Sequence, residues 1–104
     1  MAITANPSVQ NGALMTGQGT KTFFDIAAAT VIKSAAGRIA KVSVIVAGST
    51  NGAIYDATST SGNTAANQLA VIPEAVGVYL IDMPAFNGIV ITPGTSQVVT
   101  VSYQ

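Results

Sequence analysis

Short runs of β-branched residues alternate along this chain with turn-forming residues, which leaves few folds open to it. From residue 30 onward, Gly, Pro, Asn and Ser interrupt the apolar runs about every ten residues. No window of helical length keeps the 3.6-residue apolar period of an amphipathic helix. This spacing is typical of a β-sandwich or a β-barrel, and it disfavours alternating strands and helices. About seven or eight short strands are expected, including 30–32, 38–47, 53–57, 68–72, 77–83, 89–92 and 97–103.

The longest expected strand, 38–47, alternates between two unlike faces. One face is apolar and consists of Ala40, Val42, Val44 and Val46. The other face is mixed and consists of Ile39, Lys41, Ser43 and Ile45. Successive strand residues point to opposite sides of a sheet, so this strand is expected to be nearly two-sided.

Two Asn-Gly pairs, Asn51-Gly52 and Asn87-Gly88, each precede a β-branched or aromatic run. Asn and Gly tolerate the positive φ angles of tight turns, so the two pairs predict two similar hairpins. Pro73 and Pro84 are expected to end the strands before them, because proline lacks the N–H that a sheet uses. The alanine triplet 27–29 is compatible with a short helical turn.

Residues 1–22 differ in composition from the rest of the chain. This block has one charged side chain, at Lys21, and its scattered apolar residues follow no period. We expect an extended N-terminal arm over 1–22 and a single β-sandwich domain over 23–104. Two interpretations of the arm are open: it packs on a neighbouring subunit, or it is a loose terminus.

Charged residues make up only 8% of the 104-residue chain, against roughly 25% in an ordinary domain. Four basic and four acidic residues give zero net charge, which disfavours nucleic-acid binding through a basic patch. A surface with so few charges tends to associate, so we expect much of it to face other subunits. Apolar runs are too short for a membrane span, and no secretory leader is recognisable. We therefore expect no membrane partner and synthesis in a cytoplasm without export.

The chain contains no His and no Cys. The usual general base, the reactive thiolate and the commonest metal ligands are therefore missing. The four carboxylates, Asp25, Asp56, Glu74 and Asp82, are isolated and lack the spacing of a calcium loop. We expect no catalytic residue, no metal site and no cofactor, and hence no enzyme.

Six side chains are candidates for contact with a partner, namely Phe23, Phe24, Arg38, Lys41, Tyr55 and Phe86. The aromatic candidates suit stacking on sugars or packing in a core or an interface. The basic residues lie in the first half of the chain and most acidic residues in the second, which favours complementary docking of subunits. Alternatively, Arg38 and Lys41 keep one strand face hydrated or protect an edge strand.

Several segments occur in a characteristic order between residues 30 and 104. The order is Thr-Val-Ile-Lys, Ala-Gly-Arg-Ile-Ala-Lys-Val-Ser-Val, a Gly/Asn turn with Ile-Tyr-Asp, Ile-Pro, Gly-Val-Tyr, Met-Pro-Ala-Phe-Asn-Gly-Ile-Val-Ile and Val-Thr-Val-Ser-Tyr. In this order the chain resembles the small β-rich structural proteins that tailed bacteriophages encode among their virion genes. The resemblance covers residues 30–104 well and the arm poorly.

The resemblance implies a jelly-roll-like sandwich of antiparallel strands in a homo-oligomer, often a trimer, located in the virion. The implied function is decoration or cementing of the capsid, with the major capsid or tail protein as partner. The alternative is a head-fibre or tail component that binds a carbohydrate or receptor through Tyr55 or Phe86 beside the loop 58–67. The resemblance contains no catalytic or binding motif, so no functional residue is carried over.

Overall fold

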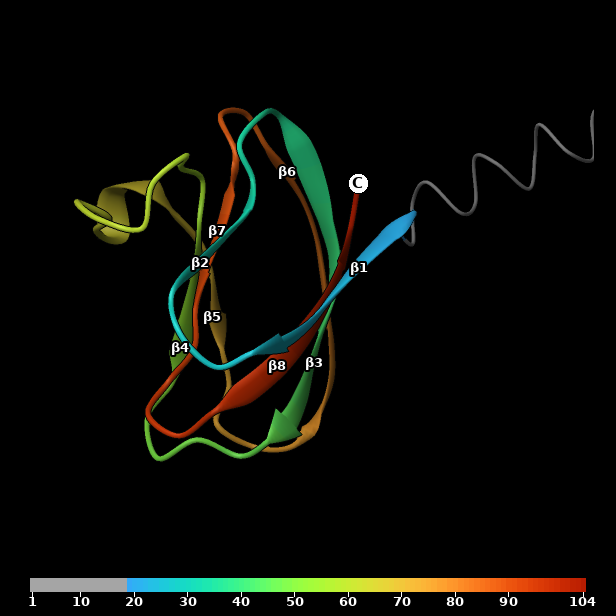
Figure 1. Ribbon diagram of the computed structural model, residues 1–104, viewed down its shortest axis with the longest axis vertical. Helices are drawn as coiled ribbons and strands as arrows, with labels where there is room; N and C mark the ends of the chain where they lie inside the picture. The colour runs from blue at the N-terminus through green and yellow to red at the C-terminus, as the bar shows by residue number, and fades with distance from the viewer. Residues whose placement is uncertain (1–18) are drawn as a thin grey trace, which may run out of the picture.

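Two four-stranded antiparallel sheets face each other in the computed structural model, which describes residues 19–104 (Figure 1). The strands are β1 (Lys21–Ile26), β2 (Thr30–Lys33), β3 (Gly37–Val46), β4 (Gly52–Tyr55), β5 (Gln68–Ile72), β6 (Gly77–Ala85), β7 (Ile89–Thr92) and β8 (Val98–Tyr103). A short 3₁₀ helix, η2 (Ala65–Asn67), lies in the connection from β4 to β5. The prediction of an all-β, antiparallel, sandwich-like fold is confirmed.

The chain crosses between the two sheets at almost every connection. Sheet I has the order β1-β8-β3-β6, and sheet II has the order β2-β7-β4-β5. Among the described strands, β4 and β5 alone are neighbours both in sequence and in a sheet. The first strand pairs with the last, the second with the seventh, the third with the sixth and the fourth with the fifth. These pairs are β1–β8, β2–β7, β3–β6 and β4–β5. The pairs β3–β8 and β4–β7 complete the sheets.

The two predicted Asn-Gly hairpins are not formed. The strands on either side of Asn51-Gly52, β3 and β4, lie in different sheets, and so do β6 and β7 around Asn87-Gly88. Neither glycine has a positive φ angle. Gly52 is needed for close packing instead, because a Cβ there would lie 2.7 Å from the side-chain oxygen of Gln97 and 2.9 Å from the Thr92 carbonyl oxygen.

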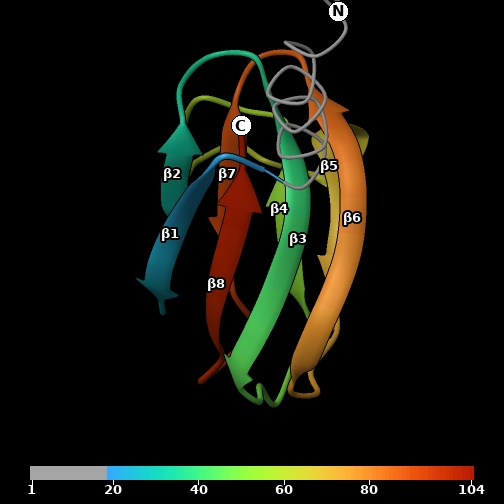
Figure 2. The same ribbon diagram turned by 90° about the vertical axis from the view of Figure 1, so that its right-hand side faces the viewer.

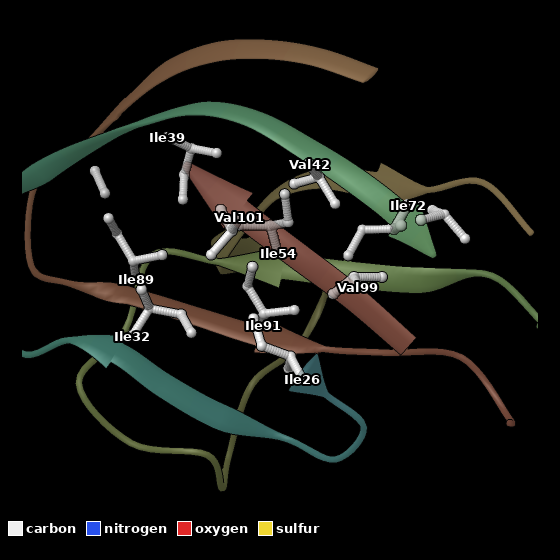
Figure 3. Packing of buried hydrophobic residues seen from close by; sticks show 12 residues of the cluster. Ile26, Ile32, Ile39, Val42, Ile54, Ile72, Ile89, Ile91, Val99 and Val101 are labelled. Carbon is white, nitrogen blue, oxygen red and sulfur yellow. The ribbon is translucent and has the colours of Figure 1, made fainter. Parts of the chain in front are cut away.

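Branched aliphatic side chains fill the space between the two sheets (Figure 3). The cluster comprises Ile26, Ile32, Ile39, Val42, Val44, Ile54, Ile72, Ala85, Ile89, Ile91, Val99 and Val101. In β8, Val99 and Val101 alternate with outward residues as predicted. Complete burial of one Val or Ile side chain contributes about 1.5–3 kcal/mol relative to exposure, so this cluster is the main source of stability.

Two β-bulges in β3 shift the alternation of its side chains. Ala40 and Ile45 are each an extra residue opposite β8. Two residues that oppose one partner re-aim the side chains that follow. Val46 is accordingly 48% exposed, so its predicted place on the apolar face is wrong. Ile39, which was expected on the mixed face, is fully buried in the core.

Both edge strands of sheet I carry a bulge at an aspartate. In β1, Phe24 and Asp25 together oppose Thr100. In β6, an extra residue at Ile81 and Asp82 shifts the pairing with β3. Asp25 and Asp82 have φ angles of 56° and 52°, a conformation that Asp adopts more readily than most residues. Bulged edges resist strand addition, so β1 and β6 are poorly suited to extend sheet I by pairing with another chain.

Three predicted boundaries differ from the structure. Pro84 lies within β6 rather than ending it, which is tolerated because β6 is an edge strand. Residues 27–29 form no helix and link β1 in sheet I to β2 in sheet II. The first strand begins at Lys21, so the end of the expected arm belongs to the sheet. The rest of that arm, residues 1–18, lies outside the described residues.

One buried polar side chain ties together the loops where β7 meets β8, a region that we call the Gln97 end. Gln97 is fully buried. Its Nε2 donates a hydrogen bond of 2.7 Å to the Pro73 carbonyl oxygen, and its Oε1 accepts one of 2.9 Å from the Gly94 N–H. The Gly48 N–H donates to the Glu74 carbonyl oxygen. The connections β3–β4, β5–β6 and β7–β8 are thereby held in one arrangement.

Candidate subunit-contact surface

The outer face of sheet I carries large apolar side chains. Figure 2 shows its four strands side by side, with this sheet toward the viewer. Phe24 and Leu80 are each 70% exposed, and Val78 is exposed to a similar degree. Ser43 pairs with Thr100 on one side and with Val78 on the other, so hydroxyl side chains separate the apolar ones. An exposed apolar face of this kind is a candidate site of contact with a protein, a membrane or a ligand.

A hollow of about 430 Å³ opens on this face between β1 and β3. Its lining consists of Phe24, Asp25, Ser43, Ile45, Val98 and Thr100. The bulge in β1 and the bulge at Ile45 in β3 both lie at its walls. Because a bulge bends its strand, these two irregularities account for the depression in an otherwise continuous sheet. We call this feature the β1–β3 hollow.

The connection from β6 to β7 contains Phe86 and lies at the end of the molecule opposite the Gln97 end. We call this region the Phe86 end. Phe86 is 77% exposed. The carboxylate of Asp56 accepts hydrogen bonds from three successive backbone N–H groups, at 3.0 Å from Phe86, 2.7 Å from Asn87 and 3.2 Å from Gly88. The loop that carries the exposed ring is therefore fixed to the end of β4.

The contacts of Asp56 lower its pKa. Partial burial by itself raises the pKa, but the N–H groups of Asn87, Phe86 and Gly88 and the side chain of Asn87 bind the charged form. The net result is a pKa below the usual value of 3.8. The charged carboxylate therefore stabilises the folded state above the unfolded-state pKa. This contribution is lost as the pH falls through the lower folded-state pKa.

Substitution Asp56→Asn should lower the free energy of unfolding by about 1 kcal/mol at pH 7, by analogy with the loss of a helix-capping carboxylate. The deficit should begin to shrink below pH 3.8 and disappear as the pH falls through the lower folded-state pKa, because the wild-type carboxylate then also becomes neutral. Urea unfolding at several pH values measures both effects.

Asp82→Asn is the matched control for this experiment. The Asp82 carboxylate forms an ion pair with Arg38, and about half of the Asp82 side chain is exposed. A surface ion pair of this kind contributes about 0–1 kcal/mol, and Asn also tolerates a positive φ angle. Equal losses in the two variants would show that the three N–H contacts of Asp56 contribute nothing special.

The eight charged side chains are divided unequally between the two ends. The Phe86 half contains Lys21, Lys33, Arg38, Lys41, Asp56 and Asp82, whereas the other half contains Asp25 and Glu74. Counting side chains alone, the Phe86 half has an excess of two positive charges and the Gln97 half an excess of two negative charges. The separation of basic and acidic residues along the sequence therefore becomes a separation of charge along the long axis of the sheets.

The structure separates the six predicted contact residues. Phe24 and Lys41 lie exposed in sheet I, and Phe86 lies at the Phe86 end. Phe23 is partly buried and packs against the core, so it presents little to a partner. Tyr55 is half-buried in β4 of sheet II, away from Phe24.

Arg38 is engaged by Asp82 in the same sheet, through two donor nitrogens. Its strand, β3, lies between β8 and β6 and is not an edge. The interpretation that Arg38 and Lys41 protect an edge strand is therefore wrong, whereas their hydrating role on an exposed strand face fits the structure.

Sequence reasoning missed Val78 and Leu80 as surface residues and Asp56 as the anchor of the Phe86 loop. The alternation in segment 77–83 could have shown that Val78 and Leu80 are exposed. Tyr79 and Ile81 pack against the core, so the residues between them point outward. For Asp56 there was no such signal, since its partners lie about thirty residues away.

Within residues 19–104, no three metal-binding side chains of the types His, Cys, Asp and Glu cluster. No helix in that part of the chain is long and apolar enough to cross a membrane. No family model, curated protein or solved structure matches this chain.

Proposed function

We propose that this chain is a non-enzymatic structural protein of a bacteriophage virion, a decoration or cement protein that binds and stabilises the capsid. The strand pairing supports a jelly roll. In such a fold a long antiparallel ribbon rolls up, so that first pairs with last, second with seventh and so on, as the pairs β1–β8, β2–β7, β3–β6 and β4–β5 do here. Jelly rolls are common among viral capsid domains, in agreement with the resemblance of the sequence.

A fold does not by itself assign a function, and one surface observation carries the proposal. The outer face of sheet I exposes Phe24, Ile45, Val78 and Leu80 in a chain with only 8% charged residues. Such a face can be covered by protein with little loss of ion hydration. A protein that functions by contact needs this property, whereas a freely diffusing monomer is harmed by it.

Assembly is the second part of the proposal. The chain forms a homo-oligomer, a trimer, that seats on major capsid or tail subunits in the virion, and its N-terminal arm adds contacts with the shell. Many modest apolar contacts of this kind add up to stable attachment when the buried area is large.

Virions banded on a density gradient, from the lysate in which the chain is made, should contain it in amounts that match shell subunits. The chain should rebind to particles stripped of it. A variant lacking residues 2–18 should unfold in urea like the full chain but rebind at least about tenfold more weakly.

Val71→Ser, at an exposed residue of β5 in sheet II, is the matched control and should rebind normally. Full rebinding of the shortened chain would disprove the role of the arm. Absence of the full chain from virions would disprove the virion assignment.

A second candidate function is recognition of a carbohydrate or receptor by a head-fibre or tail component. The rigidly held ring of Phe86 favours it, because Asp56 joins the Phe86 loop to the start of the connection that contains the loop 58–67. Exposed aromatic rings of fixed orientation stack well on sugars. Binding on a glycan array that Phe86→Ser abolishes would support it, and an array without hits would remove it.

A further inference from the structure

We propose that copies of this chain join head to tail, with the Phe86 loop of one copy seated in the β1–β3 hollow of the next. This inference deepens the oligomeric part of the proposed function and names its contacts. The exposed ring of Phe86 lies at one end of the molecule, whereas the hollow lies on the outer face of sheet I, in the half nearer the Gln97 end. Each copy can therefore offer its ring to one neighbour and its hollow to another.

The ring of Phe86 is prepared for insertion. It is the most exposed large apolar side chain of the described residues, at 77%. Three N–H bonds to Asp56 already fix the loop beneath it, so little backbone freedom is lost on binding. Central aromatic anchors in apolar pockets dominate the binding energy of many interfaces.

The β1–β3 hollow suits an aromatic ring. Phe24, Ile45 and Val98 give its walls apolar character, and Ser43 and Thr100 add short side chains that leave the space open. A ring placed there would cover Phe24 and Ile45, two of the large apolar side chains that the isolated chain leaves exposed.

Electrostatics favour the same orientation. Asp25 is the one charged residue in the lining of the hollow, and with Glu74 it makes the Gln97 half negative. The Phe86 half as a whole has an excess of positive side chains, and the one carboxylate at the loop itself, that of Asp56, is bound by three backbone N–H groups. Head-to-tail contact therefore brings opposite charges together, whereas contact between like ends brings like charges together.

The symmetry of the assembly follows from the contact. Because two different surfaces meet, the interface is heterologous. Such an interface gives a closed assembly when the rotation from one copy to the next is a whole-number fraction of 360°. In a closed trimer, each of the three Phe86 side chains occupies the hollow of a neighbouring copy, and no hollow is left empty. A face-to-face dimer of sheet I would instead bring the same surface of both copies together and leave Phe86 outside.

The absence of native cysteine makes a direct test possible. Ser43→Cys places a thiol at the hollow, and Asn87→Cys places one beside Phe86 while it keeps the backbone N–H that Asp56 binds. The two single variants, mixed and treated with a short bismaleimide, should give a cross-linked heterodimer. The double variant should give covalent trimers. Val71→Cys, in sheet II, replaces Asn87→Cys in the control and should give no cross-link with Ser43→Cys.

Each pattern of products decides the question. Cross-links between two Ser43→Cys chains, without the mixed product, would overturn the proposal in favour of a face-to-face dimer. Absence of every cross-link, with a monomeric mass in analytical ultracentrifugation, would overturn it as well. Phe86→Ser should raise the dissociation constant of the oligomer at least about tenfold, and Val71→Ser should not.

These measurements use the purified chain alone, so they are independent of the virion experiment. A chain that binds virions but gives no mixed cross-link would disprove the head-to-tail contact only. A chain that forms the cross-linked ring but never occurs in virions would disprove the virion assignment only.

Discussion

Gln97→Met should lower the free energy of unfolding by about 2–4 kcal/mol. Methionine has a similar length, so packing changes little, but it can neither donate to the Pro73 carbonyl nor accept from the Gly94 N–H. Each polar group left without a partner in a buried site costs about 1–3 kcal/mol. In a domain of this size, a loss of 3 kcal/mol corresponds to a fall in melting temperature of roughly 15 °C.

Urea unfolding followed by far-UV circular dichroism measures this loss. Protein concentration is held constant between variants, because the stability of an oligomer depends on it. Gln68→Met is the matched control: Gln68 is only partly buried and has one side-chain bond, to the Ala70 carbonyl oxygen, so its loss should stay below about 1 kcal/mol. Similar losses for both variants would mean that Gln97 does not hold the three loops together.

Gly88→Ala should lower the free energy of unfolding by about 3 kcal/mol through steric overlap at the Phe86 end. A Cβ at this position would overlap the Ala57 carbonyl oxygen and lie 2.7 Å from the Lys33 carbonyl oxygen. Both obstacles are backbone atoms, so no side-chain rotation relieves the overlap. The Gly88 N–H is also one of the three that bind Asp56, so the Phe86 loop should move.

Gly62→Ala is the control for Gly88→Ala. Gly62 has a φ angle of 78° and no atom near the position of an added Cβ. Its cost is therefore backbone strain alone, about 1 kcal/mol. A tolerated Gly88→Ala variant, with unchanged stability and unchanged oligomer, would show that the connection has room to shift and that Asp56 does not fix it.

The sequence predicted seven of the eight described strands because their signal is local, but it did not predict β1. Segments 68–72 and 89–92 coincide with β5 and β7, since β-branched runs bounded by turn residues need no distant information. Sheet membership was not predictable in this way. The Asn-Gly pairs permit a hairpin but do not require one. At position 52 glycine is needed because Gln97, in the β7–β8 connection, packs closely against it.

The candidate surface was predicted only in part for the same reason. Phe24 and Phe86 could be selected as large aromatic residues, but nothing near Phe23 in the sequence shows that it packs against the core. The β1–β3 hollow depends on bulges in β1 and β3, which arise from the register between strands. Register is a property of pairing across the sheet and cannot be read from one strand.

The pairing of β1 with β8 limits when this protein can fold. Its first and last described strands are neighbours in sheet I (Figure 2), and β8 also separates β1 from β3. Sheet I therefore cannot be completed until β8 has left the ribosome. Until then Phe24, Val42 and Val44 lack their neighbours in β8. The nascent chain also has few charges to keep it from associating with other chains. Long-range closure of this kind is slow, so we expect the yield of native protein to depend on translation rate and on chaperones that hold the chain until β8 has emerged.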